Sequence, residues 1–228
     1  MIRAVLFDAA GTLIETREPV GETYARYGAR YGLTISAWRI GEAFRRVFEA
    51  APPAVFPGLA AAARRERECA WWRERVRETF RAADSSQRAT DFDALFAALW
   101  QHFAAPEAWR LRAGAQEALV QLRAEGTRTG VVSNFDHRLP ELLGGLGILQ
   151  HLEAVVLPAD AGAAKPDPRI FSAALDRLHV APGDALFVGD HAEQDLAGAR
   201  NAGLHAMDVD ALATLADLPC RLHGGQIP

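Results

Sequence analysis

The chain has 228 residues, of which 50% are apolar and 24% are charged, and its formal net charge is −4. This length fits either one large domain or a core that carries a smaller inserted domain. The slight acidity gives no reason to expect a nucleic acid or a membrane surface as a partner. No apolar stretch approaches the roughly 20 residues of a membrane-spanning helix, and an acidic residue comes too early for a signal peptide. We therefore expect a soluble cytoplasmic protein. Cys69 and Cys220 show no metal or redox spacing and are expected to be reduced thiols.

The first predicted element is a buried strand at Ala4–Phe7, an apolar run that ends at Asp8. The chain then continues as Ala9-Ala10-Gly11-Thr12-Leu13. A carboxylate at the tip of a buried strand, followed by a Gly-Thr turn, suits an aspartate that attacks phosphorus. The start of the chain therefore predicts a nucleophile.

Residues 17–107 differ in character, because they lack strand-like runs and are rich in Ala, Arg, Glu and Trp. Helices are expected around Tyr24–Tyr31, at Arg64–Arg81, where apolar residues recur every four positions, and at Asp93–Phe103. We interpret this region as a helical insert between two core segments, residues 1–16 and 108–228.

The second half of the chain alternates between strand and helix patterns. Strands are predicted at Gly130–Ser133, Ala154–Leu157, Ala185–Val188 and His205–Val209. Helices are predicted at Ala115–Ala124, Arg138–Leu146, Pro168–Leu178 and Glu193–Ala202. Such alternation predicts an α/β fold, a doubly wound parallel sheet with helices on both faces, into which the all-helical domain is inserted.

Polar residues follow the ends of the predicted strands, where open parallel sheets bind ligands. In chain order they are Asp8, Ser133 with Asn134, Lys165, and Asp190 with Asp195 five residues on. Lys165 is also the single lysine among 25 basic residues, which indicates that an arginine would not serve there. Each signal is weak alone, but the ordered set points to one site.

This set suits phosphoryl transfer. Asp8 is expected to attack in line and form an aspartyl-phosphate that water later hydrolyses. Asp8, Asp190 and Asp195, the last directly or through water, offer hard oxygen ligands for Mg²⁺. The phosphate-binding and charge-stabilising set is Ser133, Asn134 and Lys165. The expected partner is a small phosphorylated substrate, and no residue pattern assigns an oligomeric state.

Four ordered segments resemble the motifs of the haloacid dehalogenase-like (HAD) hydrolase superfamily. They are Phe7-Asp8-Ala9-Ala10-Gly11-Thr12-Leu13, Val131-Val132-Ser133-Asn134, Lys165-Pro166-Asp167-Pro168 and Val188-Gly189-Asp190 with Asp195. The resemblance spans the whole chain and implies a Rossmann-like core with a helical cap inserted after the first motif. It also implies Mg²⁺-dependent transfer to the aspartate, most often in the hydrolysis of small phosphate esters, with the cap selecting the substrate.

Ala10 departs from this pattern. In phosphatases of the superfamily, the second residue after the nucleophile is an aspartate that protonates the leaving alkoxide and then activates water. A positioned acid or base typically contributes about 10²–10⁴-fold, which a methyl group cannot supply. The backbone carbonyl of Ala10 is still expected to ligate the metal. Transfer to Asp8 is therefore expected for good leaving groups and expected to be slow for alkyl phosphates.

Several groups are candidates for the missing acid. His191 directly follows Asp190, and an imidazole suits proton transfer near neutrality. Asp136, His137 and Glu15 are further candidates. The alternative for His191 is a polar loop residue, and the alternative for Asp136 and Glu15 is a helix-cap or hinge carboxylate. A proton from the substrate itself, or a water held by the cap, is equally admissible.

Three functions follow from these observations. The leading hypothesis is a Mg²⁺-dependent hydrolase acting on a small phosphorylated metabolite. Ala10 motivates the alternative, a catalytically impaired protein that binds a phosphorylated ligand or a partner. The third is a 2-haloacid dehalogenase, against which the retained Gly189-Asp190 counts, because such members of the superfamily generally lack it. Phosphonate-cleaving members carry alanine at position 10 but use a cap lysine, and residues 17–107 contain none.

Overall fold

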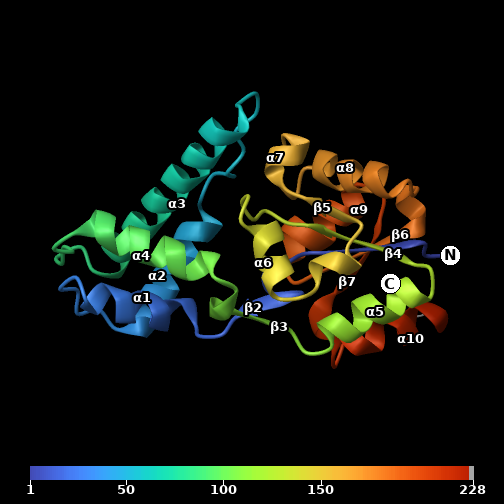
Figure 1. The fold of residues 1–228 in the computed structure, drawn as a ribbon, viewed down its shortest axis with the longest axis horizontal. Helices are drawn as coiled ribbons and strands as arrows, with labels where there is room; N and C mark the ends of the chain where they lie inside the picture. The colour runs from blue at the N-terminus through green and yellow to red at the C-terminus, as the bar shows by residue number, and fades with distance from the viewer. Residues whose placement is uncertain (226–228) are drawn as a thin grey trace. The chain divides into compact units, whose positions relative to one another are not determined.

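The computed structural model describes residues 1–225 and divides into two compact units (Figure 1). The core unit comprises Met1–Glu15, Ala54–Gly58 and the chain from Arg110 onward, and the helical unit comprises Thr16–Pro53 and Leu59–Trp109. Among the described residues, no helix combines the length and the apolar composition needed to cross a membrane.

The core unit contains a five-stranded parallel sheet in the order β5-β4-β1-β6-β7. The strands are β1 (Ala4–Phe7), β4 (Arg128–Val132), β5 (Ala154–Val156), β6 (Ala185–Gly189) and β7 (His205–Asp208). At the centre of the sheet, Phe7 is level with Val131 of β4 and Val188 of β6. The carboxyl ends of β4, β1 and β6 therefore lie side by side, and the predicted α/β fold with a parallel sheet is confirmed.

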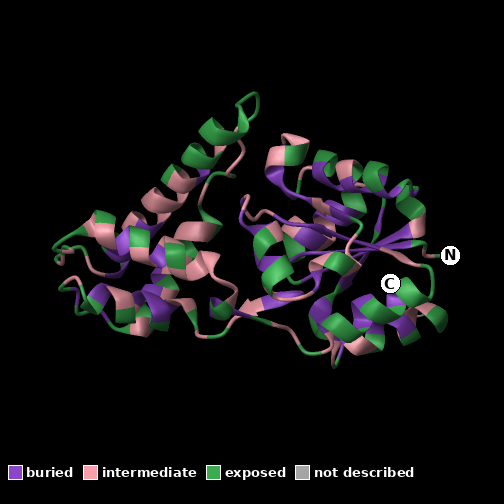
Figure 2. Cartoon of the chain, viewed as in Figure 1, coloured by how far each residue is buried: buried purple, intermediate pink, exposed green. Residues whose placement is uncertain are grey.

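Helices cover both faces of this sheet, with α8 on one side and α5 and α10 on the other (Figure 1). The core helices are α5 (Ala115–Ala124), α6 (Leu139–Gly145), α7 (Pro158–Ala161), α8 (Pro168–Leu178), α9 (Gly198–Asn201) and α10 (Leu218–His223). On α8, Phe171 packs edge-to-face against Phe187 of β6, with ring centroids 5.2 Å apart. The central strands β1 and β6 are buried along their whole length, as their continuous apolar runs predict (Figure 2).

The predicted helix at Glu193–Ala202 is not regular. Ala192–Ala197 forms a π-helical turn, and only the following four residues form the α-helix α9. The amide of Leu196 donates to the carbonyl of His191, five residues back, at 3.2 Å. The wider turn takes up an extra residue, and Asp195 is buried within it. Side-chain periodicity does not reveal such a turn.

The helical unit consists of α1 (Val20–Ala29), α2 (Ala37–Glu49), α3 (Ala61–Ala83) and α4 (Phe92–Ala104). Its apolar centre includes Tyr24 of α1, which stacks on Phe80 of α3 with ring centroids 5.6 Å apart. The exposed side of α3 carries Arg–Glu pairs three residues apart, such as Arg77 with Glu74. The amphipathic patterns of the insert therefore match a unit with its own apolar core.

Two short strands that the sequence patterns did not predict pair where the chain passes between the units. They are β2 (Ile14–Thr16) and β3 (Trp109–Leu111). Across this pair, Arg110 Nε donates to Glu15 Oε1 at 2.8 Å. Three residues are too few to show an alternating pattern, so the sequence carries no signal for this sheet.

Candidate active site

Backbone hydrogen bonds fix the loop that carries Asp8. The Asp8 amide donates to the carbonyl of Val188 on β6 at 2.9 Å, and the Ala9 carbonyl accepts the amides of the three residues at 12–14. Gly11 adopts a positive φ of 99°, and a Cβ there would lie 2.3 Å from Oδ2 of Asp190. The Gly-Thr turn therefore brings the loop against Asp190 in a way that only glycine permits.

Lys165 lies between two carboxylates. Its Nζ donates to Oδ1 of Asp8 and to Oδ1 of Asp195, each at 2.6 Å, and its side chain is only 2% exposed. A compact ammonium meets both oxygens in this buried space, which the planar fork of an arginine would not do in the same way. The structure thus accounts for the single lysine of the chain.

Asp195 reaches the site from the π-helical turn. Its Oδ2 accepts the backbone amides of Asp190 at 3.2 Å and His191 at 3.0 Å. A Cβ on Gly189 would lie 2.5 Å from this oxygen. Thr12 donates its hydroxyl to Oδ1 of Asp190 at 3.3 Å. The end of β6 is therefore folded tightly around the Asp195 carboxylate.

The site holds more negative than positive charge. Burial raises the pKa of Asp8, the nearby Lys165 ammonium opposes this shift, and the negative charge of Asp195 adds to it. Burial also raises the pKa of Asp190, and repulsion from Asp8 and Asp195 adds to it. Burial disfavours the charged form of Lys165, but the two carboxylates outweigh that effect and raise its pKa. Three carboxylates thus face one ammonium, and the excess negative charge favours the binding of a further cation.

The donor set fits a hard divalent cation. Carboxylate oxygens of Asp8, Asp190 and Asp195 all lie within 4.8 Å of one another. Mg²⁺ prefers one or two carboxylates together with waters and substrate phosphate oxygens. The Ala10 carbonyl stays a predicted ligand, and its peptide is oriented by a 2.8 Å hydrogen bond from the Gly11 amide to the carbonyl of Ile14.

The second motif holds the lysine loop. Asn134 Oδ1 accepts the Lys165 backbone amide at 2.8 Å, and Asn134 Nδ2 donates to the Lys165 carbonyl at 3.0 Å and to Gln194 Oε1 at 3.1 Å. Ser133 is buried at the end of β4, where its amide donates to the carbonyl of Val156 at 3.2 Å. Phosphate binding by Ser133 and Asn134 stays a prediction. The contact with Gln194 had no signal in the sequence, because a single polar residue in a loop forms no pattern.

His191 acts as a cap of the π-helical turn. Its Nδ1 accepts the backbone amide of Gln194 at 3.2 Å, so the proton of the neutral ring lies on Nε2. A second proton on Nδ1 would displace this amide. A protonated His191 ring would therefore lose this capping hydrogen bond. The role of His191 as the replacement acid stays a prediction.

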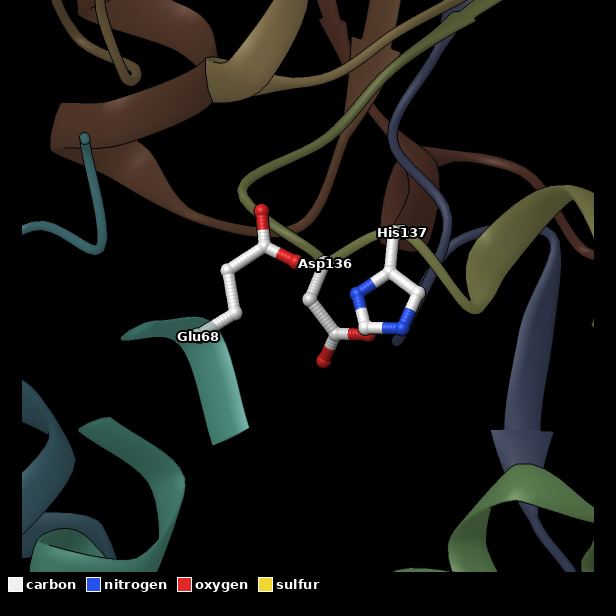
Figure 3. A group of neighbouring side chains, drawn as sticks. All are labelled: Glu68, Asp136 and His137. Atoms are coloured by element: carbon white, nitrogen blue, oxygen red, sulfur yellow. The ribbon is translucent and has the colours of Figure 1, made fainter. Parts of the chain in front are cut away.

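The other candidate acids have partners of their own. Asp136 is buried and bidentate with Arg138, which donates through Nε at 2.8 Å and Nη2 at 2.6 Å. His137 Nδ1 lies 3.9 Å from Oδ1 of Asp136, on the segment after β4 (Figure 3). Glu15 pairs with Arg110 across β2 and β3. Asp136 and Glu15 are thus held in ion pairs, and a role for either as the replacement acid stays a prediction.

Comparisons with known proteins agree with this geometry. Residues 2–203 match the haloacid dehalogenase-like hydrolase family. Human haloacid dehalogenase-like hydrolase domain-containing protein 3 is 36% identical over 207 residues, which cover 90% of this chain and 80% of that protein. A phosphoserine phosphatase from Thermus thermophilus is 35% identical over 160 residues, which cover 68% of this chain and 59% of that protein.

Two solved structures share the fold. A putative beta-phosphoglucomutase from Thermotoga maritima has a TM-score of 0.70 at 19% identity, covering 98% of this chain and 99% of that chain. The L-2-haloacid dehalogenase from Xanthobacter autotrophicus has a TM-score of 0.67 at 22% identity, covering 99% of this chain and 84% of that chain. At these identities the likeness concerns the fold alone. With four ordered motifs, a parallel sheet that gathers three of their acids around one lysine, and the family match, the chain belongs to the haloacid dehalogenase-like hydrolases.

Proposed function

We propose that this protein is a Mg²⁺-dependent hydrolase that transfers a phosphoryl group from a small phosphorylated molecule to Asp8. The observation that carries the proposal is the buried Lys165 ammonium, 2.6 Å from Oδ1 of both Asp8 and Asp195, with Asp190 beside them. A lysine held against the nucleophile offsets the charge that accumulates when a dianionic phosphate meets a carboxylate.

The chemistry has two steps. Asp8 attacks phosphorus in line and the leaving oxygen departs with its electron pair, which gives an aspartyl-phosphate. Water then attacks phosphorus and loses a proton to the surrounding solvent, the bond to Asp8 breaks, inorganic phosphate is released and the Asp8 carboxylate is regenerated. A Mg²⁺ held by the carboxylates at positions 8, 190 and 195 would supply charge neutralisation at the phosphoryl oxygens. Within this scheme the helical insert at residues 17–107 serves as the cap that selects the substrate.

Ala10 determines which substrates turn over well. A methyl group cannot protonate a leaving alkoxide, whereas a phenolate of low pKa leaves without a proton. The likeness to a phosphoserine phosphatase makes phosphoserine the natural alkyl phosphate to compare. We expect p-nitrophenyl phosphate to be hydrolysed with a kcat at least tenfold above that for phosphoserine.

The test measures phosphate release from both substrates, with Mg²⁺ and with a chelator, for the wild type and for Asp8→Asn. Activity that requires Mg²⁺ and disappears in Asp8→Asn supports the proposal. If the activated aryl phosphate is not turned over in an Asp8-dependent way, the hydrolase proposal fails.

Ala10 also favours a second candidate, a protein that binds a phosphorylated ligand with negligible turnover. Saturable binding of a phosphate mimic such as orthovanadate, together with no Asp8-dependent hydrolysis, would support it. Chloride release from a 2-haloacid without metal would instead indicate the dehalogenase.

A further inference from the structure

One polar residue of the π-helical turn has no part in the proposed chemistry. Gln194 immediately precedes Asp195, and its Oε1 accepts a hydrogen bond from Nδ2 of Asn134 at 3.1 Å. Its backbone amide donates to Nδ1 of His191 at 3.2 Å, so both its side chain and its main chain are held. The contact joins residues 60 positions apart, one in the segment after β4 and the other in the turn after β6.

Asn134 passes this constraint to the lysine loop. Its Oδ1 accepts the Lys165 amide at 2.8 Å, and its Nδ2 donates to the Lys165 carbonyl at 3.0 Å. With Gln194 on the second hydrogen of Nδ2, every donor of this amide group is used. An amide whose hydrogen bonds are all made within the protein cannot rotate without breaking one of them.

The same turn also holds the other end of the lysine. Asp195 Oδ1 accepts a hydrogen bond from the Lys165 ammonium at 2.6 Å. Gln194, one residue earlier, holds Asn134, which in turn is hydrogen-bonded to the Lys165 backbone. Hydrogen bonds therefore connect both the side chain and the backbone of Lys165 to the π-helical turn. Consecutive residues of a regular α-helix point about 100° apart, and in this widened turn Gln194 and Asp195 both make contacts that hold Lys165.

We propose that Gln194 is a positioning residue, which holds Asn134 and thereby sets the place of the Lys165 ammonium against Asp8. The kinetic consequence rests on the proposed function, whereas the structural link does not.

The chain offers a selective probe, because Lys165 is its single lysine. Protein labelled with [¹⁵N]lysine, carrying a tag without lysine, gives one backbone amide signal, whose hydrogen exchange reports the bond from the Lys165 amide to Asn134. We expect Gln194→Met, which keeps the length but removes the acceptor, to speed this exchange about fivefold, as for the loss of one ordinary hydrogen bond. Gln194→Glu restores an acceptor and should bring the rate back to within about twofold of wild type.

Controls bracket this result. Glu193→Met changes the exposed neighbour and should leave the exchange rate unchanged, whereas Asn134→Ala removes the acceptor itself and should speed exchange more than Gln194→Met does. If Gln194→Met and wild type exchange at the same rate, the inference is overturned, whatever the activity of the protein.

The kinetic arm uses p-nitrophenyl phosphate with Mg²⁺. We expect Gln194→Met to lower kcat about tenfold while KM stays within about twofold, and Gln194→Glu to recover most of kcat, because displacement of the lysine affects the transition state more than binding. An unchanged kcat beside faster exchange would show that the link does not serve catalysis and would overturn the positioning role. No turnover by the wild type would overturn the proposed function, and the exchange arm would still decide whether Gln194 holds Lys165.

Discussion

At the scale of single residues, Ala10 is the position that departs from the first motif of the superfamily's phosphatases. It is exposed in the nucleophile loop, two residues after Asp8. Because the superfamily's phosphatases carry their acid at this position, we propose that Ala10→Asp restores an acid for the leaving oxygen. We expect this variant to raise kcat on phosphoserine at least tenfold, because a positioned acid contributes about 10²–10⁴-fold.

Ala10→Asn is the matched control, since its side chain has the same shape but no titrating proton. Phosphate release from phosphoserine should stay near the wild-type rate in Ala10→Asn. A well-folded Ala10→Asp variant with an unchanged rate would mean that another group, such as His191, already moves the proton.

A second residue-scale effect concerns Asp167, directly after the lysine loop. Its carboxylate accepts the side chain and the backbone amide of Arg169, and these hydrogen bonds lower its pKa from 3.8 to about 2. Because the folded pKa lies below the unfolded value, the stabilisation is present above about pH 4 and is lost as the pH falls toward about 2. Carboxyl-detected NMR titration should show the low midpoint in the wild type and a higher one in Arg169→Ala. Equal midpoints would contradict this role of Arg169.

At the scale of elements, the core sheet was readable from the sequence and the turns were not. All five predicted strands are present. Short continuous apolar runs bounded by polar residues are typical of buried strands, which is why they could be predicted. The gathering of Asp8, Lys165 and Asp190 follows from their places at strand ends. The π-helical turn and the contact between Gln194 and Asn134 had no such signal, since they depend on hydrogen bonds between distant residues.

Gly21 of α1 and Gly41 of α2 lie at the crossing of these two helices in different surroundings. A Cβ on Gly21 would lie 2.3 Å from the Ala37 carbonyl oxygen, whereas the nearest atom to a Cβ on Gly41 is 4.0 Å away. Gly21→Ala should therefore destabilise the helical unit by about 1–3 kcal/mol, as overpacking does. Gly41→Ala should be neutral or stabilise by up to about 1 kcal/mol, because alanine favours a helix interior.

Urea denaturation followed by tryptophan fluorescence measures both variants in the helical unit. Equal midpoints for Gly21→Ala and the wild type would show that the two helices can separate at no cost. A marked loss in Gly41→Ala would place the close approach at a different point of the crossing.

At the scale of the whole molecule, the chain has two compact units with separate apolar centres. Its tryptophans are unevenly divided between these units. All five tryptophans, at positions 38, 71, 72, 100 and 109, belong to the helical unit, whereas the proposed Mg²⁺ ligands and the single lysine belong to the core unit. Tryptophan fluorescence thus follows one unit, and the [¹⁵N]lysine amide signal follows the other.

This division makes metal binding a test of how the molecule unfolds. A ligand that binds only the folded core stabilises it by about 2.7 kcal/mol at one hundred times its Kd. If each unit unfolds on its own apolar core, Mg²⁺ should raise the urea midpoint of the Lys165 signal and leave the tryptophan midpoint unchanged. In Asp190→Asn, which loses a proposed ligand, the shift of the Lys165 midpoint should shrink. A tryptophan midpoint that moves together with that of Lys165 would show that the two units unfold as one, and the helical unit would then share the stabilisation that the core carboxylates gain from the metal.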